Sequence, residues 1–296
     1  MGEFTTLIEG LSFTESPRWR EGRLWISDFY THRVLAVSLD GTAETIAEVP
    51  QQPSGLGWLP DGRMLIVSMR DRRILRREHD GSLDTHANLI DIAPWHLNDM
   101  VVDSVGRAYV GNFGFDLMGG AQARSTCLIR VDPDGSASIV ADDLGFPNGM
   151  VITPDGSTLV VAESFTDRLT AFSVAADGAL SGRRDWAEFG PRPTATDVAI
   201  ALGEASVVPD GICLDAEGAI WVADAVHGRL LRVTDGGEIL DELDGPMGIF
   251  ACMLGGVDGR TLFACAAPTF AEHEASADHR AAILMTEVAV PHAGLP

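Results

Sequence analysis

The sequence lacks any apolar run long enough to cross a membrane. Its most apolar stretches, such as residues 212–214 and 220–223, are interrupted by Asp or Gly well before the roughly 20 residues that a membrane helix needs. The amino terminus carries the acidic Glu3 and shows neither the basic region nor the apolar region of a secretory signal. We therefore expect a soluble protein that does not associate with membranes.

Positive charge is scarce. The chain has 21 Lys and Arg residues against 43 Asp and Glu residues, which gives a net charge of -22. A surface of this charge repels phosphate backbones and anionic lipid headgroups, so we expect no nucleic-acid partner. Part of the acidity could serve a cation, but most of it is expected on a solvated surface that keeps the protein in solution.

Cysteine is rare, and the four cysteines form no C-x-x-C pair. Most of them lie beside apolar residues in strand-like stretches, where a small buried thiol is common. Cys252 and Cys265 could face each other across a hairpin, but a chain of 296 residues needs no disulfide to hold its core. These features favour reduced thiols and a cytoplasmic location.

Several catalytic motifs are also missing. The sequence contains no G-x-S-x-G elbow, no G-x-x-x-x-G-K-[ST] loop and no H-E-x-x-H pair. The nearest approach to the last motif is His273–Glu274, but His279 follows His273 by six positions instead of four. Serine, phosphate-loop and zinc-protease chemistries therefore lose support.

What the sequence does contain is an internal repeat rich in turns. The 32 Gly and 15 Pro residues are spread along the chain in turn-like dipeptides. An apolar strand, an Asp-Gly or similar turn and further apolar strands recur six times, with starts near positions 15, 54, 98, 148, 210 and 247. Spacings of this size are typical of propeller blades. The repeat predicts an all-β, single-domain, six-bladed β-propeller over residues 1–296, with four-stranded blades.

The segments outside the repeat have expected places in this fold. Residues 4–8 precede the first copy and would close the ring by pairing with the last blade, which removes exposed sheet edges. Residues 113–126 and 190–208 break the rhythm and are expected to be long loops, the first of them a lid over the axis. No window shows a helical stripe of useful length.

One register position of the repeat carries the candidate site. Equivalent points of successive blades lie at the same height around a propeller axis. In chain order that position holds Glu15, Ser54, Asn98, Asn148, Asp210 and Met247. The two carboxylates and two carboxamides among them would form an oxygen cage that suits Ca²⁺ and also admits Mg²⁺ or Mn²⁺. Alone, an Asn or Asp before Gly is an ordinary turn former, so the repeated register is what indicates a metal site.

At these residues the chain resembles the gluconolactonase, SMP-30 (regucalcin) and luciferin-regenerating-enzyme family. The matching segments are residues 15–19 (ESPRW), 97–100 (LNDM), 146–150 (FPNGM) and 209–215 (PDGICLD). The resemblance implies a calcium-dependent hydrolase in which Glu15, Asn148 and Asp210 bind the metal. It implies that Asn98 contacts the substrate or joins the coordination shell. Asp210 is the implied general base, and Asp99 is the less favoured alternative.

The chain departs from the sugar lactonases of that family at His96, where a sugar-binding Arg is typical. Together with Phe113 and other nearby apolar residues, this departure indicates a less polar lactone or ester as the substrate. His227 lies in a loop of the fifth blade and is a further candidate for substrate contact.

The expected reaction is hydrolysis of a small-molecule lactone or ester. A divalent cation, Ca²⁺ before Mg²⁺, Mn²⁺ or Zn²⁺, would polarise the carbonyl, and a carboxylate would activate water. Two alternatives stay open: hydrolysis of organophosphates or other esters on the same metal site, and a propeller that holds a metal and binds a partner without catalysis. The sequence leaves the oligomeric state open.

Overall fold

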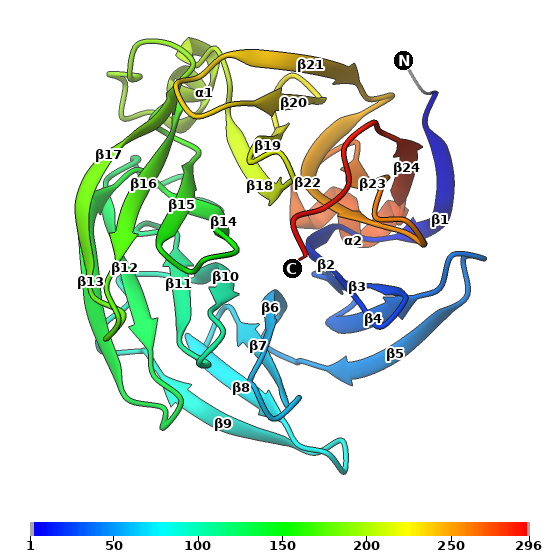
Figure 1. Cartoon of the computed structure of the whole chain (residues 1–296), viewed down its shortest axis with the longest axis horizontal. Coiled ribbons are helices and arrows are strands. Elements are labelled where there is room, and N and C mark those ends of the chain that lie inside the picture. The colour runs from blue at the N-terminus through cyan, green and yellow to red at the C-terminus, as the bar shows by residue number, and fades with distance from the viewer. Residues whose placement is uncertain (1–2, 295–296) are drawn as a thin grey trace.

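The computed structural model describes residues 3–294 and contains six four-stranded antiparallel sheets, arranged as blades around a central axis (Figure 1). This arrangement confirms the six-bladed β-propeller predicted from the repeat. In blades 1 to 5 the first strand in sequence lies at the axis and the later strands follow outward, whereas the outermost strand of blade 6 comes from the amino-terminal end of the chain.

From the axis outward, blades 1 to 3 each contain four strands that follow one another in the sequence. They are β2 (Thr14–Arg20), β3 (Arg23–Asp28), β4 (Arg33–Val37) and β5 (Ala43–Glu48); β6 (Pro53–Trp58), β7 (Met64–Ser68), β8 (Arg73–Arg77) and β9 (Leu83–Asn88); and β10 (Leu97–Val102), β11 (Ala108–Asn112), β12 (Thr126–Val131) and β13 (Ala137–Leu144).

Blades 4 to 6 follow the same order. Their strands are β14 (Pro147–Ile152), β15 (Thr158–Glu163), β16 (Arg168–Val174) and β17 (Leu180–Glu188); β18 (Pro209–Leu214), β19 (Ile220–Asp224), β20 (Arg229–Val233) and β21 (Ile239–Asp244); and β22 (Gly248–Gly255), β23 (Thr261–Ala267), β24 (Ala281–Glu287) and β1 (Thr5–Leu11).

The ring is closed by the amino-terminal strand, as predicted. β1 pairs antiparallel with β24, with Thr5 opposite Met285 and Leu11 opposite Ala281. The last blade therefore takes its outermost strand from the start of the chain, so the two ends of the repeat are joined by backbone hydrogen bonds.

Burial falls from the axis to the rim. The innermost strands β14 and β18 are buried at every residue, whereas the outer strands β5 and β21 are mostly exposed. The exposed outer strands accordingly carry charged residues, such as Glu44 and Glu48 in β5 and Asp241 and Glu242 in β21. Packing between neighbouring inner strands fixes the positions of the strand ends that form the site.

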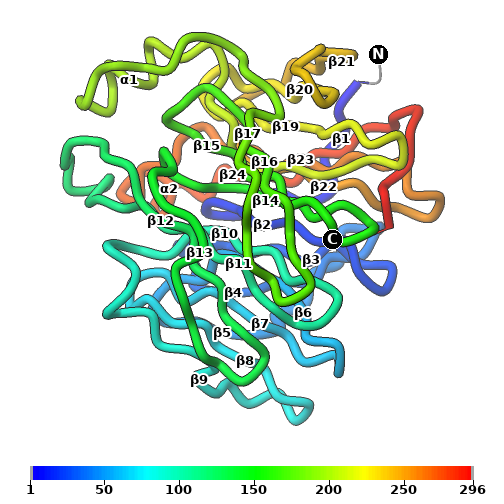
Figure 2. The backbone as a smooth tube through the Cα atoms, turned by 60° about the vertical axis from the view of Figure 1, so that its left-hand side comes forward, coloured from blue at the N-terminus to red at the C-terminus, as the bar shows by residue number. Residues whose placement is uncertain are grey.

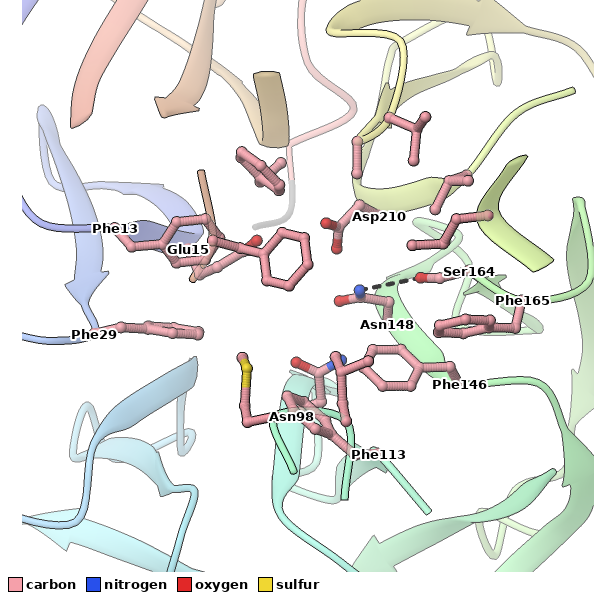
Figure 3. Close-up of a pocket in the computed structure, with 18 of the residues that line it drawn as sticks. Phe13, Glu15, Phe29, Asn98, Phe113, Phe146, Asn148, Ser164, Phe165 and Asp210 are labelled. Atoms are coloured by element: carbon pink, nitrogen blue, oxygen red, sulfur yellow. Dashed lines mark hydrogen bonds between the residues drawn. The ribbon is translucent and has the colours of Figure 1, made fainter. Parts of the chain in front are cut away.

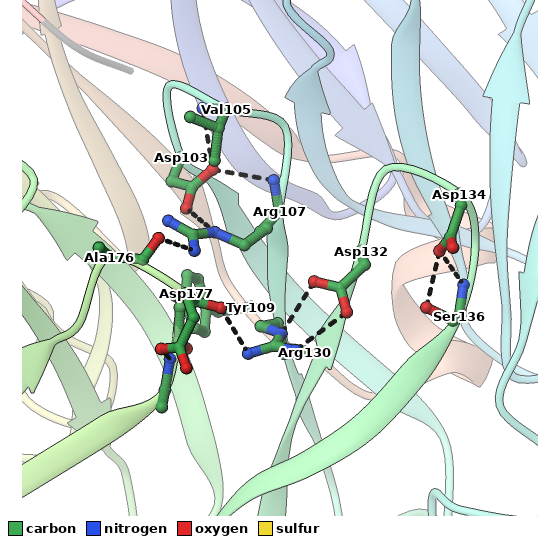
Figure 4. A network of polar contacts seen from close by, with 12 residues as sticks. Asp103, Val105, Arg107, Tyr109, Arg130, Asp132, Asp134, Ser136, Ala176 and Asp177 are labelled. Atoms are coloured by element: carbon green, nitrogen blue, oxygen red, sulfur yellow. Dashed lines mark hydrogen bonds and ion pairs between the residues drawn. The ribbon is translucent and has the colours of Figure 1, made fainter.

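Asp-Gly turns behave as the repeat predicts. Asp134 accepts hydrogen bonds from the backbone N–H (2.9 Å) and the hydroxyl (2.6 Å) of Ser136, an arrangement that stabilises a tight turn (Figure 4). Near another such turn, Arg107 donates to Asp103 at 2.6 Å and to the carbonyl of Ala176 at 2.8 Å (Figure 4). The second contact ties blade 3 to blade 4.

The structure adds two short helices to the expected all-β chain. α1 (Val198–Glu204) lies within the expected loop 190–208, and α2 (Glu272–Asp278) joins β23 to β24. Each has seven residues, which is too short for a helical period to stand out in the sequence. No helix within the described residues is long and apolar enough to span a membrane.

The four cysteines are buried and free, as expected for core thiols. Cys252 and Cys265 do not face each other across their hairpin, because Cys252 lies opposite Ala264 and Cys265 lies opposite Ala251. An offset of one residue along a strand places the two side chains on opposite faces of the sheet.

Candidate active site

Four oxygen-bearing side chains from four blades lie together at one end of the axis (Figure 3). Each is the second residue of the innermost strand of its blade: Glu15 in β2, Asn98 in β10, Asn148 in β14 and Asp210 in β18. In all four blades the pairing with the next strand is irregular at this position. A bulge bends the strand end and re-aims the side chain, which turns the head groups toward the axis.

The sixth blade places Phe250 at the equivalent position, which corrects the alignment that put Met247 there. The irregular pairing of β22 falls between Ile249 and Ala251. A Cβ added to Gly211 would lie 2.3 Å from the Cβ of Ala251 and 3.2 Å from the carbonyl oxygen of Phe250. A Cβ added to Gly149, at the same register of blade 4, would likewise collide with the backbone around Gly211. The axis site is thus bounded by an aromatic ring on the side of blade 6.

The two carboxamides are held with their oxygens toward the axis. Asn148 donates its Nδ2 hydrogen to the hydroxyl of Ser164 at 3.2 Å, and Ser164 in turn donates to the carbonyl of Pro209 at 2.8 Å. Asn98 donates from Nδ2 to the carbonyl of Pro147 at 3.4 Å. Since both amide nitrogens are engaged elsewhere, both amide oxygens are free to face the centre of the site (Figure 3).

The two carboxylates of the cage are in an unfavourable environment for negative charge. Burial, followed by the nearby charges of Asp210 and Asp99, raises the pKa of Glu15 well above its usual value. Burial and the charge of Asp99 likewise raise the pKa of Asp210. Within residues 3–294 no donor reaches Oδ1 of Asp210. A buried, unpartnered carboxylate oxygen beside a second carboxylate is what a cation site requires.

An ion pair beneath the cage sets its charge balance. Arg18 donates from Nη2 to Asp99 at 2.8 Å and to the carbonyl of Met100 at 2.7 Å, and both charged side chains are almost completely buried. When all three carboxylates are ionised, Arg18 offsets one of them. The remaining formal charge of about −2 matches one divalent cation.

The donor set fits a hard cation. Two carboxylates and two carboxamides supply only oxygen, which Ca²⁺ prefers, and neither Cys nor His takes part. In the described part of the chain, no three His, Cys, Asp or Glu side chains gather as a metal cluster. The floor of the site contains two such side chains, Glu15 and Asp210, and the amide oxygens of Asn98 and Asn148 complete the set of four oxygen donors.

A pocket opens above the cage on one face of the ring. The cavity itself has a volume of about 110 Å³, and the space that includes its open mouth is about 730 Å³. The polar lining lies on the floor, whereas loops before the inner strands and after the second strands supply apolar walls. The walls include Phe13, Phe29, Tyr30, Phe113, Phe146, Phe165, Phe250 and Phe270.

Of the predicted substrate-contact residues, Asn98 and Phe113 line the pocket, whereas His96 and His227 do not. Asp99, the predicted alternative base, does not line the pocket either. The ring of His96 lies behind that of Phe113, with centroids 6.0 Å apart, and burial lowers its pKa. His227 contacts the carboxylate of Asp224 at 2.9 Å and is partly exposed.

The two long loops contribute to the mouth of the pocket. Leu117 and Met118 come from the loop 113–126, and Leu202 comes from α1 in the segment 190–208. The loops touch each other, because the backbone N–H of Ala123 donates to the carbonyl of Thr196 at 2.7 Å. Both project on the same side of the ring (Figure 2). The first loop forms part of the pocket wall, and its movement as a lid stays a prediction.

Sequence reasoning missed Ser164, Arg18 and most of the aromatic wall. A second register would have found several of them: the residues directly after the second strand of a blade. In blades 1, 3, 4 and 5 these positions hold Phe29, Phe113, Ser164 and Ala225, which line the pocket, whereas Met69 and Pro268 at the same register of blades 2 and 6 do not. Antiparallel pairing brings the end of a second strand beside the start of the first, so both registers share one face of the ring.

Removal of the Ser164 hydroxyl tests its role in orienting Asn148. We expect Ser164→Ala to weaken binding of Ca²⁺ about 10-fold to 100-fold, because residues that orient ligands have effects of this size. Calcium titration by calorimetry measures it. Ser157→Ala, the same change at an exposed position of the same blade, should leave the affinity unchanged. Equal affinities for the two variants would refute the orienting role.

The structure is a six-bladed β-propeller with an oxygen-lined axis beneath a pocket. The chain belongs to the SMP-30/gluconolactonase/LRE-like family, whose model matches residues 13–267. Among its relatives is a pentonolactonase of Haloferax volcanii, 28% identical over 78% of this chain and 73% of the relative. A 6-deoxy-6-sulfogluconolactonase of Pseudomonas putida is 28% identical over 84% of this chain and 81% of the relative.

Solved structures share the fold. A calcium-binding protein, regucalcin, from Agrobacterium tumefaciens matches with a TM-score of 0.78 and 21% identity, covering 100% of this chain and 97% of its own. A gluconolactonase from Xanthomonas campestris matches with a TM-score of 0.74 and 23% identity, covering 98% and 90%. At these identities the likeness shows the propeller architecture alone.

Proposed function

We propose that the protein is a divalent-metal-dependent hydrolase that opens lactone rings. The observation that carries the proposal is the oxygen set of Glu15, Asn98, Asn148 and Asp210 on the floor of an otherwise apolar pocket. The names of two relatives, a pentonolactonase and a 6-deoxy-6-sulfogluconolactonase, support the reaction class.

We propose Ca²⁺ as the resident cation, with Mg²⁺, Mn²⁺ and Zn²⁺ as alternatives. Glu15, Asn148 and Asp210 would hold it, with Asn98 as a fourth ligand or a substrate contact. The all-oxygen donor set favours hard cations, and Zn²⁺ is disfavoured because it usually takes nitrogen or sulfur ligands. When bound, the cation would supply a Lewis acid for the carbonyl oxygen of the ring ester.

The chain's own residues would carry the proton. Asp210 accepts a proton from water as the water oxygen bonds to the carbonyl carbon. The ring C–O bond then breaks, and the proton passes from Asp210 to the leaving alkoxide, which yields an open-chain hydroxy acid. Asp99 is the weaker candidate for this role, because it is paired with Arg18 and does not line the pocket. The aromatic walls exclude bulk water from the reacting groups.

The test is a substrate panel on chelated protein resupplied with single cations. Lactones, carboxylic esters and phosphotriesters would each be assayed with Ca²⁺, Mg²⁺, Mn²⁺ and Zn²⁺. We expect lactone hydrolysis that disappears on chelation and returns with Ca²⁺. Faster turnover of phosphotriesters or open-chain esters would favour the alternative hydrolase. Full activity after chelation, or no activity with any pair, would contradict the proposal, and the second result would favour a binding role.

We also propose that the protein is located in the cytoplasm. Four free cysteines, all buried, accord with a reducing compartment such as the cytoplasm. Fractionation of the cells, followed by specific detection of the protein in each fraction, would test this location directly. Recovery in an exported fraction would contradict it.

A further inference from the structure

We infer that the pocket selects neutral, hydrophobic lactones, with an alkyl or aryl substituent, over polyhydroxylated or anionic ones. The inference rests on the proposed function, because it names the substrate class of the same site. It also separates this chain from relatives named for sugar lactones. Three features of the described lining carry it: two aromatic walls, side chains without positive charge, and wall hydroxyls that are already hydrogen-bonded.

Two aromatic walls face each other across the cage (Figure 3). On one side, the ring of Phe13 lies 4.8 Å from that of Phe250 and 5.3 Å from that of Phe29, measured between centroids. On the other side, the rings of Phe113 and Phe146 lie 4.6 Å apart. Because these rings pack on one another and are buried, they form a preorganised slot for an apolar group.

The side chains that line the pocket supply no positive charge. Within residues 3–294, no Arg, Lys or His lines the pocket, and its two carboxyl groups, on Glu15 and Asp210, lie on the floor. With the lactone ring on the floor beside the proposed cation, an anionic substituent would lie against the apolar rings of the walls without a partner. Burial of an unpaired charge is strongly unfavourable, so the pocket discriminates against carboxylated, sulfonated and phosphorylated substrates.

The polar groups near the walls are already engaged. The hydroxyl of Tyr30 donates to the carbonyl of Phe270 at 2.6 Å. Ser164 accepts from Asn148 and donates to Pro209. The hydroxyl groups of a sugar lactone would therefore lose water without gaining protein partners. Each buried hydroxyl left unpaired lowers affinity by roughly tenfold or more.

The apolar lining continues to the mouth. Met118, Val226 and Phe270 line the pocket and are 47%, 47% and 41% exposed, so they form an apolar rim. A substituent that leaves the floor stays on apolar surface until it reaches solvent. The pocket therefore accommodates a chain of several carbons in addition to the lactone ring.

A δ-lactone series tests the inference at constant ring size. For the metal-loaded protein, we expect kcat/KM to rise about threefold to fourfold per added methylene from δ-hexalactone to δ-decalactone. Glucono-δ-lactone should be at least about 100-fold poorer than δ-decalactone. A glucono-δ-lactone rate equal to or above that of δ-decalactone, or rates independent of the alkyl chain, would overturn the inference.

A matched pair of variants locates the effect in the pocket. Val226→Arg places a cation at the rim and should lower kcat/KM for δ-decalactone about tenfold, while improving a lactone whose chain ends in a carboxylate. Val257→Arg is the control, because Val257 is 96% exposed in the β22–β23 turn and does not line the pocket. Equal effects of the two variants would overturn the inference.

A binding measurement separates this inference from the proposed function. Piperidin-2-one and its 6-pentyl derivative are lactams that mimic the lactones without being hydrolysed. We expect the pentyl lactam to bind at least about 100-fold more tightly by calorimetry. If no lactone is hydrolysed but the lactams keep this preference, the hydrolase proposal fails and the inference stands. If lactones are hydrolysed and the lactams bind equally, only the inference fails.

Discussion

Asp210→Asn is expected to abolish both divalent-cation binding and lactone hydrolysis. The substitution keeps the shape of the side chain but removes one of the two carboxylates of the cage and the proposed proton acceptor. General bases contribute about 10²–10⁴-fold, and loss of the cation adds to this, so kcat/KM should fall by about 10⁴-fold or more. Steady-state kinetics with added Ca²⁺ measures the effect. Asp91→Asn, at an exposed position, should retain activity.

The stability of the same variant shows whether misfolding causes its loss of activity. Burial and the charge of Asp99 raise the pKa of Asp210 in the folded protein. The free energy of unfolding of the metal-free protein therefore falls as the pH rises above the pKa that Asp210 has in the unfolded chain. At pH 7 without metal, the Asn variant should therefore be at least as stable as the parent. A 100-fold excess of Ca²⁺ over Kd should raise the parent's Tm by roughly 5–10 °C and leave that of the variant unchanged.

Two outcomes would contradict the role assigned to Asp210. One is an Asp210→Asn variant that binds Ca²⁺ with unchanged affinity. The other is a metal-stripped variant that retains full hydrolytic activity. A variant that is inactive and also less stable than the parent at pH 7 would show that the carboxylate supports the fold by a contact other than the proposed cation.

Arg18→Met is expected to cause the largest loss of stability. Arg18 is the partner of the buried Asp99, and the charges of both residues act on the nearby carboxyl of Glu15. Removing one partner of a buried pair leaves an uncompensated charge, which lowers the free energy of unfolding by about 3–5 kcal/mol. Chemical denaturation of the metal-free protein measures this loss.

A double variant separates the charge from the packing. Arg18→Met combined with Asp99→Asn removes both charges and should recover most of the lost stability. Arg280→Met, which removes an arginine from the exposed pair with Asp278, should cause no measurable change. If the double variant is as unstable as the single one, packing of Arg18 explains the loss, and the charge balance proposed for the cage is wrong.

The repeat predicted the fold because the turn residues of each blade can be recognised in its local sequence. Asp-Gly pairs mark the hairpins, and apolar runs between them have the length of strands, so six copies were visible without any long-range information. The register of Glu15, Asn98, Asn148 and Asp210 followed from the same alignment. The place of Phe250 in this register was missed because residues 246–248 resemble in sequence the turns that precede the other inner strands. The irregular pairing of β22 falls later, between Ile249 and Ala251.

The walls of the pocket were harder to predict than its floor. They are assembled from loops of different blades, so Phe29, Phe165 and Phe270 are neighbours of the cage in space and not in sequence. Individually, each aromatic is an ordinary core residue. The Arg18–Asp99 pair was hidden for a related reason: 81 positions separate the two residues, and only the packing of β2 near β10 brings them together.

Anomalous X-ray scattering from crystals soaked with Mn²⁺ tests the central claim most directly. We expect one strong peak on the propeller axis, with oxygens of Glu15, Asn148 and Asp210 about 2.0–2.6 Å away and a side open to the pocket. Absence of an axial peak, or a peak that touches fewer than two of these three side chains, would show that the four blades do not build a common cation site.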